Sequence, residues 1–196
     1  LDILLKLGAI LITITGFGSD NVNQVYSRAE EICNNITNAP LLFSAIAGLE
    51  TYNLFRAHYD EGIKKSRQLI DIADDSEDEI YSVQGSLAMG TNLFWKGDLI
   101  NAEKHFLNAI GKYRFEQHHQ MIQLTSRDLG VASHCHYSTL LNFFIQPDAG
   151  ERHLAQGFDI ARRLKQPFTM GYALCAAGHF HMINLDPDKT LESSEE

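Results

Sequence analysis

Small and apolar side chains alternate with polar ones at helical spacing along this chain. The clearest stretch covers 97–109, where a Gly-Asp turn is followed by Ala102, Phe106 and Ala109 on one face of a helix. Alanine at two of these positions lets a neighbouring helix approach closely, and the phenylalanine fills the gap between them. The stretch therefore predicts an amphipathic helix that packs tightly against a partner helix.

The same small position recurs at a long, regular interval. Val22, Gly62, Ala102 and Gly150 each open a comparable helical face, and they are separated by 40, 40 and 48 residues. Repetition with about this period is typical of stacked helical units. The longer third interval predicts eight extra residues between Tyr113 and Val131.

The pattern predicts alternating first and second helices, separated by Gly, Asp/Ser or Pro breaks. The expected first helices cover 3–15, 41–57, 78–96, 131–145 and 168–184. The expected second helices cover 21–36, 59–73, 99–113 and 149–164. The last first helix is expected to have no partner after Asp186-Pro187-Asp188.

We therefore expect an all-α fold, a right-handed superhelix of antiparallel helix pairs with about 4.5 repeats. The whole chain, 1–196, would form this single domain. The alternative is that the same amphipathic helices form a compact bundle. The expected repeats cover approximately 1–37, 38–76, 77–130 with its long connection, 131–166, and a half repeat over 167–196.

Composition narrows the functional classes. The chain has 196 residues, 16 Lys and Arg against 25 Asp and Glu, and a formal net charge of −9. Such an acidic balance without clustered basic residues argues against a nucleic-acid partner. The sequence has no Gly-rich phosphate loop, no Cys-x-x-Cys and no nucleophile elbow. We therefore expect neither a cofactor nor an autonomous enzyme.

The cysteines and the N-terminal stretch bear on location. Three cysteines without the regular spacing of a disulfide framework favour a reduced, cytoplasmic setting.

The apolar stretch 1–14 is interrupted by Asp2 and Lys6, and its uncharged run is shorter than the roughly 20 residues of a membrane span. We interpret it as a buried helix and expect no membrane association. The missing initiator Met and the acidic end suggest a fragment of a longer multidomain protein.

The 97–109 stretch resembles the second helix of a tetratricopeptide (TPR) repeat, and Gly90 occupies the small position of a TPR first helix. The wider array resembles the C-terminal TPR region of bacterial signalling proteins that join a class III adenylate/guanylate cyclase domain to an AAA-type ATPase module. The residues that carry this likeness are Leu7-Gly8-Ala9-Ile10-Leu11-Ile12, Gly16-Phe17, Val22, Tyr26, Arg28-Ala29-Glu30, Cys33, Tyr113, Gln117-His118, Asp128, Gly130-Val131, Pro147-Asp148, Ala161-Arg162 and Leu164.

The resemblance implies a non-catalytic interaction or regulatory module in signal transduction, with any catalysis elsewhere in the parent chain. Its partner would be a protein, a peptide or another domain of that chain, held in a concave groove lined by first helices. Groove candidates are Asn53, Arg56, Asn92 and Ser138. The alternative is a ligand-sensing helical repeat domain of an ATPase-linked transcriptional regulator, which would show a closed pocket with convergent polar groups.

Three further features have a structural and a functional interpretation. Cys175 and His179 are four residues apart and lie on one face of the expected helix. Together with His134 from the neighbouring first helix, they could bind zinc. Packing is the favoured interpretation of these side chains, and we expect no metal. His118 and Asp128 in the long connection could bridge each other, cap helices or touch a partner domain. The acidic run at 71–79 lacks the register of a calcium loop and is interpreted as helix-capping charge.

The end of the chain suggests one more contact. The terminal hairpin at 168–185, expected to lack its second helix, could pair between two copies and give a homodimer.

Overall fold

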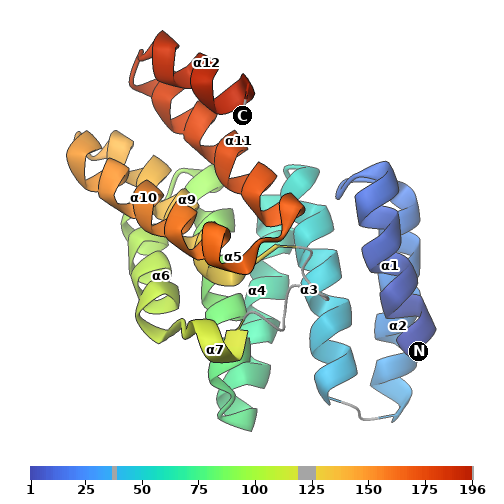
Figure 1. Cartoon of the computed structure of the whole chain (residues 1–196). Coiled ribbons are helices and arrows are strands. Elements are labelled where there is room, and N and C mark those ends of the chain that lie inside the picture. The colour runs from blue at the N-terminus through green and yellow to red at the C-terminus, as the bar shows by residue number, and fades with distance from the viewer. Residues whose placement is uncertain (37–38, 119–126, 196) are drawn as a thin grey trace.

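The computed structural model describes residues 1–36, 39–118 and 127–195, and all of its regular elements in this part are α-helices (Figure 1). The fold is therefore all-α, as the sequence predicts. The eleven helices are α1 (Asp2–Thr15), α2 (Asp20–Ile36), α3 (Ala39–Phe55), α4 (Tyr59–Ser76), α5 (Glu79–Lys96), α6 (Leu99–Lys112), α7 (Phe115–His118), α9 (Leu129–Phe143), α10 (Pro147–Leu164), α11 (Pro167–Ile183) and α12 (Pro187–Glu195).

The helices pack as neighbouring pairs arranged in two layers. α1 pairs with α2, α3 with α4, α5 with α6, α9 with α10 and α11 with α12, and each pair packs against the next (Figure 1). Within one layer, α1 contacts α3, α3 contacts α5, α5 contacts α9 and α9 contacts α11. We call α1, α3, α5, α9 and α11 the inner layer. This arrangement is consistent with an α-solenoid.

The second helices share one burial pattern, which places the repeated small positions in equivalent surroundings. In α2, α4, α6 and α10 the small position and the residues four and seven positions later are all buried, because this face lies against the inner layer. These buried residues are Val22, Tyr26 and Ala29; Gly62, Ser66 and Leu69; Ala102, Phe106 and Ala109; and Gly150, Leu154 and Gly157. The recurring intervals in the sequence thus correspond to a recurring packing face.

A left-handed turn ends four of the inner helices at the same place in each unit. Ala57, Gly97, Ile145 and Leu185 all have a positive φ, and they are separated by 40, 48 and 40 residues. After each of them, the backbone N–H of the next residue donates to a carbonyl five positions back, at 2.8–3.0 Å, which is the hydrogen bond of a Schellman cap. The last turn therefore belongs to the same repeat as the others.

This turn corrects the expected half repeat. The prediction that the last hairpin lacks its second helix is wrong, because α12 follows the turn at Leu185 and packs on α11. Proline at the first position of α12 favours the helix start, since its fixed φ is helical and its missing N–H would have no partner there. Pro147 opens α10 in the same way.

The N-terminal stretch also differs from its interpretation as a buried helix. α1 buries one face, with Leu5, Gly8 and Ile12 against the neighbouring helices. The opposite face is exposed at Ile3, Leu7, Ile10 and Ile14. Across the described part of the chain, no helix has the length and apolarity needed to cross a membrane.

Glycine permits the closest helix approaches in the first units. The Tyr26 ring of α2 lies between α1 and α3, so that a Cβ atom added to Gly8 would be 2.5 Å from its Cζ. A Cβ atom on Gly48 would be 2.4 Å from its Cδ1. A larger residue at either position would displace the tyrosine ring.

Candidate functional site

Two of the cavities that the described residues form on the inner layer share part of their lining. One has a volume of about 350 Å³ and lies between the end of α3, the start of α4, α5, α9 and α11. The other, of about 170 Å³, lies between α5, α9 and α11. Trp95, His136 and Tyr172 line both cavities. We call these two cavities together the inner groove.

The inner groove is poor in charge because of the helices that build it. α9 and α11 contain no Asp, Glu, Lys or Arg, and α3 contains only Glu50. The lining is instead aromatic and aliphatic, with Leu54 and Phe55 from α3 and Trp95 from α5. A groove of this kind binds apolar side chains by removing both surfaces from water.

Arg127 supplies the one charged side chain of the described groove lining. It directly precedes α9 and is only 8% exposed. Its guanidinium carbon lies 5.6 Å from the ring centroid of Phe17 and 5.4 Å from that of Tyr172, within the range of a cation–π contact. Arg127 therefore connects the turn after α1 with α11, although 155 residues separate these two aromatic rings in the sequence.

Glu50 is a buried acid of α3 that lines neither cavity. Its carboxyl accepts hydrogen bonds from the Asn92 side-chain amide at 2.5 Å and from the Thr51 hydroxyl at 3.3 Å. Burial raises the pKa of Glu50 to about 7, and the positive charge of Arg127 and these hydrogen bonds lower it in part. The carboxyl thus changes charge near neutral pH.

His136 and Tyr172 form a second polar contact in the groove. The Tyr172 hydroxyl lies 2.9 Å from His136 Nε2. Burial and, to a smaller extent, the positive charge of Arg127 lower the pKa of His136 to about 3. The imidazole ring is therefore neutral at pH 7, and it stacks on Phe106 with ring centroids 5.9 Å apart.

Trp95 is the most exposed large aromatic side chain of the groove apart from Phe55. Its side chain is 47% exposed, and its ring lies nearly parallel to that of His179, with centroids 6.3 Å apart and planes at 13°. Phe94 packs against its edge. The chain has a single tryptophan, so the fluorescence of Trp95 reports on this site alone.

The four groove candidates from the sequence do not line these cavities. Asn53 is half-buried and its side-chain amide donates to the Leu49 carbonyl oxygen at 2.8 Å, whereas Arg56 is exposed. Asn92 and Ser138 are fully buried between helices. Helical periodicity assigned these residues to first helices, but it could not tell which side of a first helix faces the groove.

The three metal candidates are only partly brought together. Cys175 and His179 both line the smaller cavity. His134 points instead to α10, where its Nδ1 lies 3.0 Å from His153 Nδ1. Among the described residues, no three His, Cys, Asp or Glu side chains are arranged to hold a metal ion.

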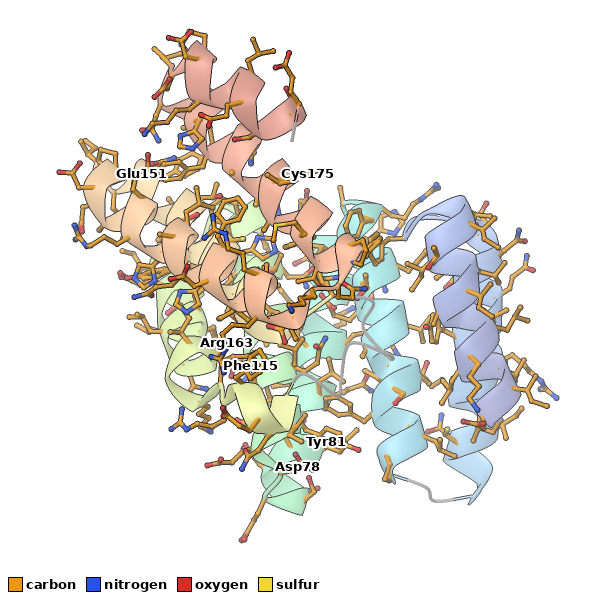
Figure 2. All side chains as sticks on the ribbon, viewed as in Figure 1. Asp78, Tyr81, Phe115, Glu151, Arg163 and Cys175 are labelled. Carbon is orange, nitrogen blue, oxygen red and sulfur yellow. The ribbon has the colours of Figure 1, made fainter. Side chains whose placement is uncertain are left out.

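The long connection begins with the short helix α7, which is fixed to α10. The Arg163 guanidinium carbon lies 3.8 Å from the Phe115 ring centroid, and Arg163 Nη2 lies 3.6 Å from Glu116 Oε1 (Figure 2). The His118 side chain lies outside the described residues. Asp128 caps α9 by accepting from the N–H groups of Gly130 and Val131, so its predicted capping role is confirmed.

The acidic run at 71–79 also contains a helix cap. Asp78 Oδ1 accepts from the N–H groups of Ile80 and Tyr81 at 2.8 and 3.1 Å, at the start of α5 (Figure 2). This contact confirms the capping interpretation for Asp78.

The chain was also compared with known proteins. No protein-family model, curated protein or solved structure matches it. The resemblance to TPR arrays of cyclase- and ATPase-linked proteins therefore stays a prediction. The groove geometry carries the functional argument by itself.

Proposed function

We propose that this helical array is a non-catalytic binding module whose inner groove holds a peptide segment of another protein or of another domain in a longer chain. The observation that carries the proposal is the inner groove itself, where two cavities of about 350 and 170 Å³ share Trp95, His136 and Tyr172. An extended peptide can place successive side chains in adjoining cavities of this kind.

The aromatic lining supports a binding role. Tryptophan, tyrosine and arginine dominate the energetics of protein interfaces, because they bury large surfaces and also provide hydrogen bonds. Trp95, Tyr172 and Arg127 provide these three residue types within one groove. The inner layer is held in place by its contacts along the array, so the side chains of the groove are positioned before a partner arrives.

We propose further that the units are TPR-like and form a right-handed superhelix. The recurring small positions and the left-handed turns at 40- and 48-residue intervals support this repeat type. In a cytoplasmic signalling protein with a cyclase or ATPase module, such an array would report partner binding to the other domains.

A ligand-sensing domain remains the second candidate, and one observation favours it. The larger cavity has about the volume of a small-molecule site, and the buried Arg127 and the half-buried His136 and Tyr172 line it. A sensor of this kind would bind a free small molecule in the same cavity.

Selection from a random peptide library displayed on phage tests the proposed function. Binding peptides should lose about tenfold or more in affinity on Trp95→Ala, since truncating an aromatic anchor at an interface costs more than about 1.4 kcal/mol. Leu107→Ala is the matched control, because Leu107 is also 47% exposed but lies on α6, away from the groove. The proposal would be contradicted by selected peptides whose affinity is the same for the wild type and for Trp95→Ala, or by a selection that yields no binding peptide.

A further inference from the structure

The first helix has two apolar faces, and the fold buries only one of them. That face packs on α2 and α3. The other face is a row of four large aliphatic side chains, each 41–79% exposed: Ile3, Leu7, Ile10 and Ile14. We call this row the α1 stripe. Contiguous exposed apolar surface of this kind marks a contact with another molecule. Since α1 lies at the N-terminal edge of the array, a second molecule can approach it (Figure 1).

The spacing of the α1 stripe indicates which molecule covers it. Its residues follow one another at intervals of four, three and four, which is the alternation of core positions in a coiled coil. This order is the same when it is read from either end. If a second α1 packs antiparallel on the first, Ile3 faces Ile14 of the other copy and Leu7 faces its Ile10. A two-fold symmetric interface requires a surface that matches itself in this way.

The polar side chains beside the stripe are already paired within one copy. Lys6 forms an ion pair with Asp2 of the same helix at 2.8 Å. The Thr13 hydroxyl donates to the Ala9 carbonyl oxygen at 3.2 Å, so it can lie at an interface without losing a partner. In the antiparallel arrangement Lys6 lies opposite Thr13 of the other copy rather than opposite a second lysine. The N-terminus of each helix also lies beside the C-terminus of the other, where the helix dipoles attract.

We propose that the α1 stripe is the interface of a two-fold symmetric dimer of this chain, in which the α1 helices of the two copies pack antiparallel. Four large aliphatic side chains from each copy remove on the order of 1,000 Å² from water, at the lower end of the range for a specific interface. Because α1 is already fixed on α2 and α3, dimerisation does not have to order a new helix. The dimer presents two inner grooves in one assembly.

Sedimentation equilibrium of the whole chain tests the proposal. We expect a dimer with a Kd on the order of 10 μM, as for a small interface between preformed surfaces. Leu7→Glu should weaken the dimer about 100-fold or more, because the new carboxylate would be buried against Ile10 of the other copy. Leu107→Glu is the matched control and should leave the Kd unchanged, since Leu107 has a similar exposure, 47%, but lies on α6. A monomer at about 200 μM, or a dimer that Leu7→Glu leaves intact, would overturn the proposal.

The terminal hairpin, which the sequence suggests as a dimer contact, is separated from the α1 stripe by one more variant. Leu185→Glu changes a residue of that hairpin that is 87% exposed. We expect it to dimerise like the wild type. A dimer lost in Leu185→Glu and kept in Leu7→Glu would assign the contact to the hairpin and would contradict the α1 interface.

Disulfide formation tests the direction of the two helices. Ile3→Cys and Ile14→Cys are made separately, each together with Cys175→Ser, because Cys175 is the exposed one of the three native cysteines. When the two proteins are mixed and oxidised by oxygen with a copper–phenanthroline catalyst, a disulfide should join one copy of each. Neither protein alone should crosslink. Absence of the mixed disulfide, or crosslinking of each protein with itself as in a parallel pair, would contradict the antiparallel interface.

Discussion

The side-chain amide of Asn92 in α5 donates a hydrogen bond of 2.5 Å to the Glu50 carboxyl in α3, across 42 residues of sequence. Both side chains are buried, and Asn92 also donates to the Ala88 carbonyl oxygen of its own helix. The Asn92 side chain lies directly against Gly62 of α4, where a Cβ atom would overlap it. One amide thus joins three helices of two neighbouring units.

We expect Asn92→Ala to lower the free energy of unfolding by about 2 kcal/mol, because the Glu50 carboxyl loses its closest donor in a buried site. Urea denaturation measures the change. Asn53→Ala is the control, since the half-buried Asn53 donates only to a backbone carbonyl of its own helix and should cost less than about 1 kcal/mol. Equal losses in the two variants would show that the contact between the units contributes nothing.

The raised pKa of Glu50 makes the free energy of unfolding decrease as pH rises towards neutrality. The folded pKa, about 7, lies above the ordinary value of 4.5, so the folded state binds the proton more tightly than the unfolded state does. This contribution to stability is fully present below pH 4.5 and is lost as pH rises to about 7. We expect Glu50→Gln to become more stable relative to the wild type by roughly 3 kcal/mol between pH 4.5 and 7. Denaturation of both proteins across this range measures the difference, and a difference that does not vary with pH would contradict the assignment.

Two histidines with lowered pKa values give the free energy of unfolding a pH dependence of the opposite sign. Burial lowers the pKa of His134 to about 4 and that of His136 to about 3, from the ordinary 6.5. The unfolded state therefore binds more protons below pH 6.5, and stability falls as pH decreases through this region. We expect His134→Gln to reduce the pH slope of the unfolding free energy between pH 6 and 5 by about one proton. A slope that His134→Gln leaves unchanged would contradict this assignment.

The left-handed turn after α9 contains a residue that is poorly suited to it. Ile145 is β-branched, has a φ of 59° and is 88% exposed, so its side chain gains nothing from packing. Ile145→Gly should raise the free energy of unfolding by about 1 kcal/mol, because glycine adopts this conformation without strain. The same substitution at Ile10, an exposed position within α1, should lower it by about 1 kcal/mol. Destabilisation by both changes would contradict the strained turn.

The glycines of the inner layer are expected to differ in their tolerance of a methyl group. Gly48→Ala should destabilise the chain by about 2 kcal/mol, since its Cβ atom would press on Tyr26. Gly171→Ala should stabilise it by about 1 kcal/mol, because no atom lies near this exposed position of α11 and alanine is the better helix former. Thermal melting of the two variants checks the sign of each effect.

The helices were predictable from the sequence because each unit repeats one buried pattern, in which Ala102 and Phe106 have counterparts such as Val22 and Tyr26. α12 is not predictable in this way, because it has no buried residue of its own and because its Pro187 is compatible with a helix end as well as with a helix start. The groove was less predictable, since Arg127 reaches it through a long-range contact that no local pattern encodes. The insertion before Val131 was the available signal that this part of the chain differs from the other units.

The central claim is that the inner groove holds a peptide, and NMR of the Trp95 indole N–H tests it most directly. The chain has one tryptophan and therefore one such signal. On titration with a peptide from the library selection, we predict a large shift of this signal and further shifts confined to α3, α5, α9 and α11. An unmoved Trp95 signal, with shifts on α2, α6 or α10 instead, would contradict the account.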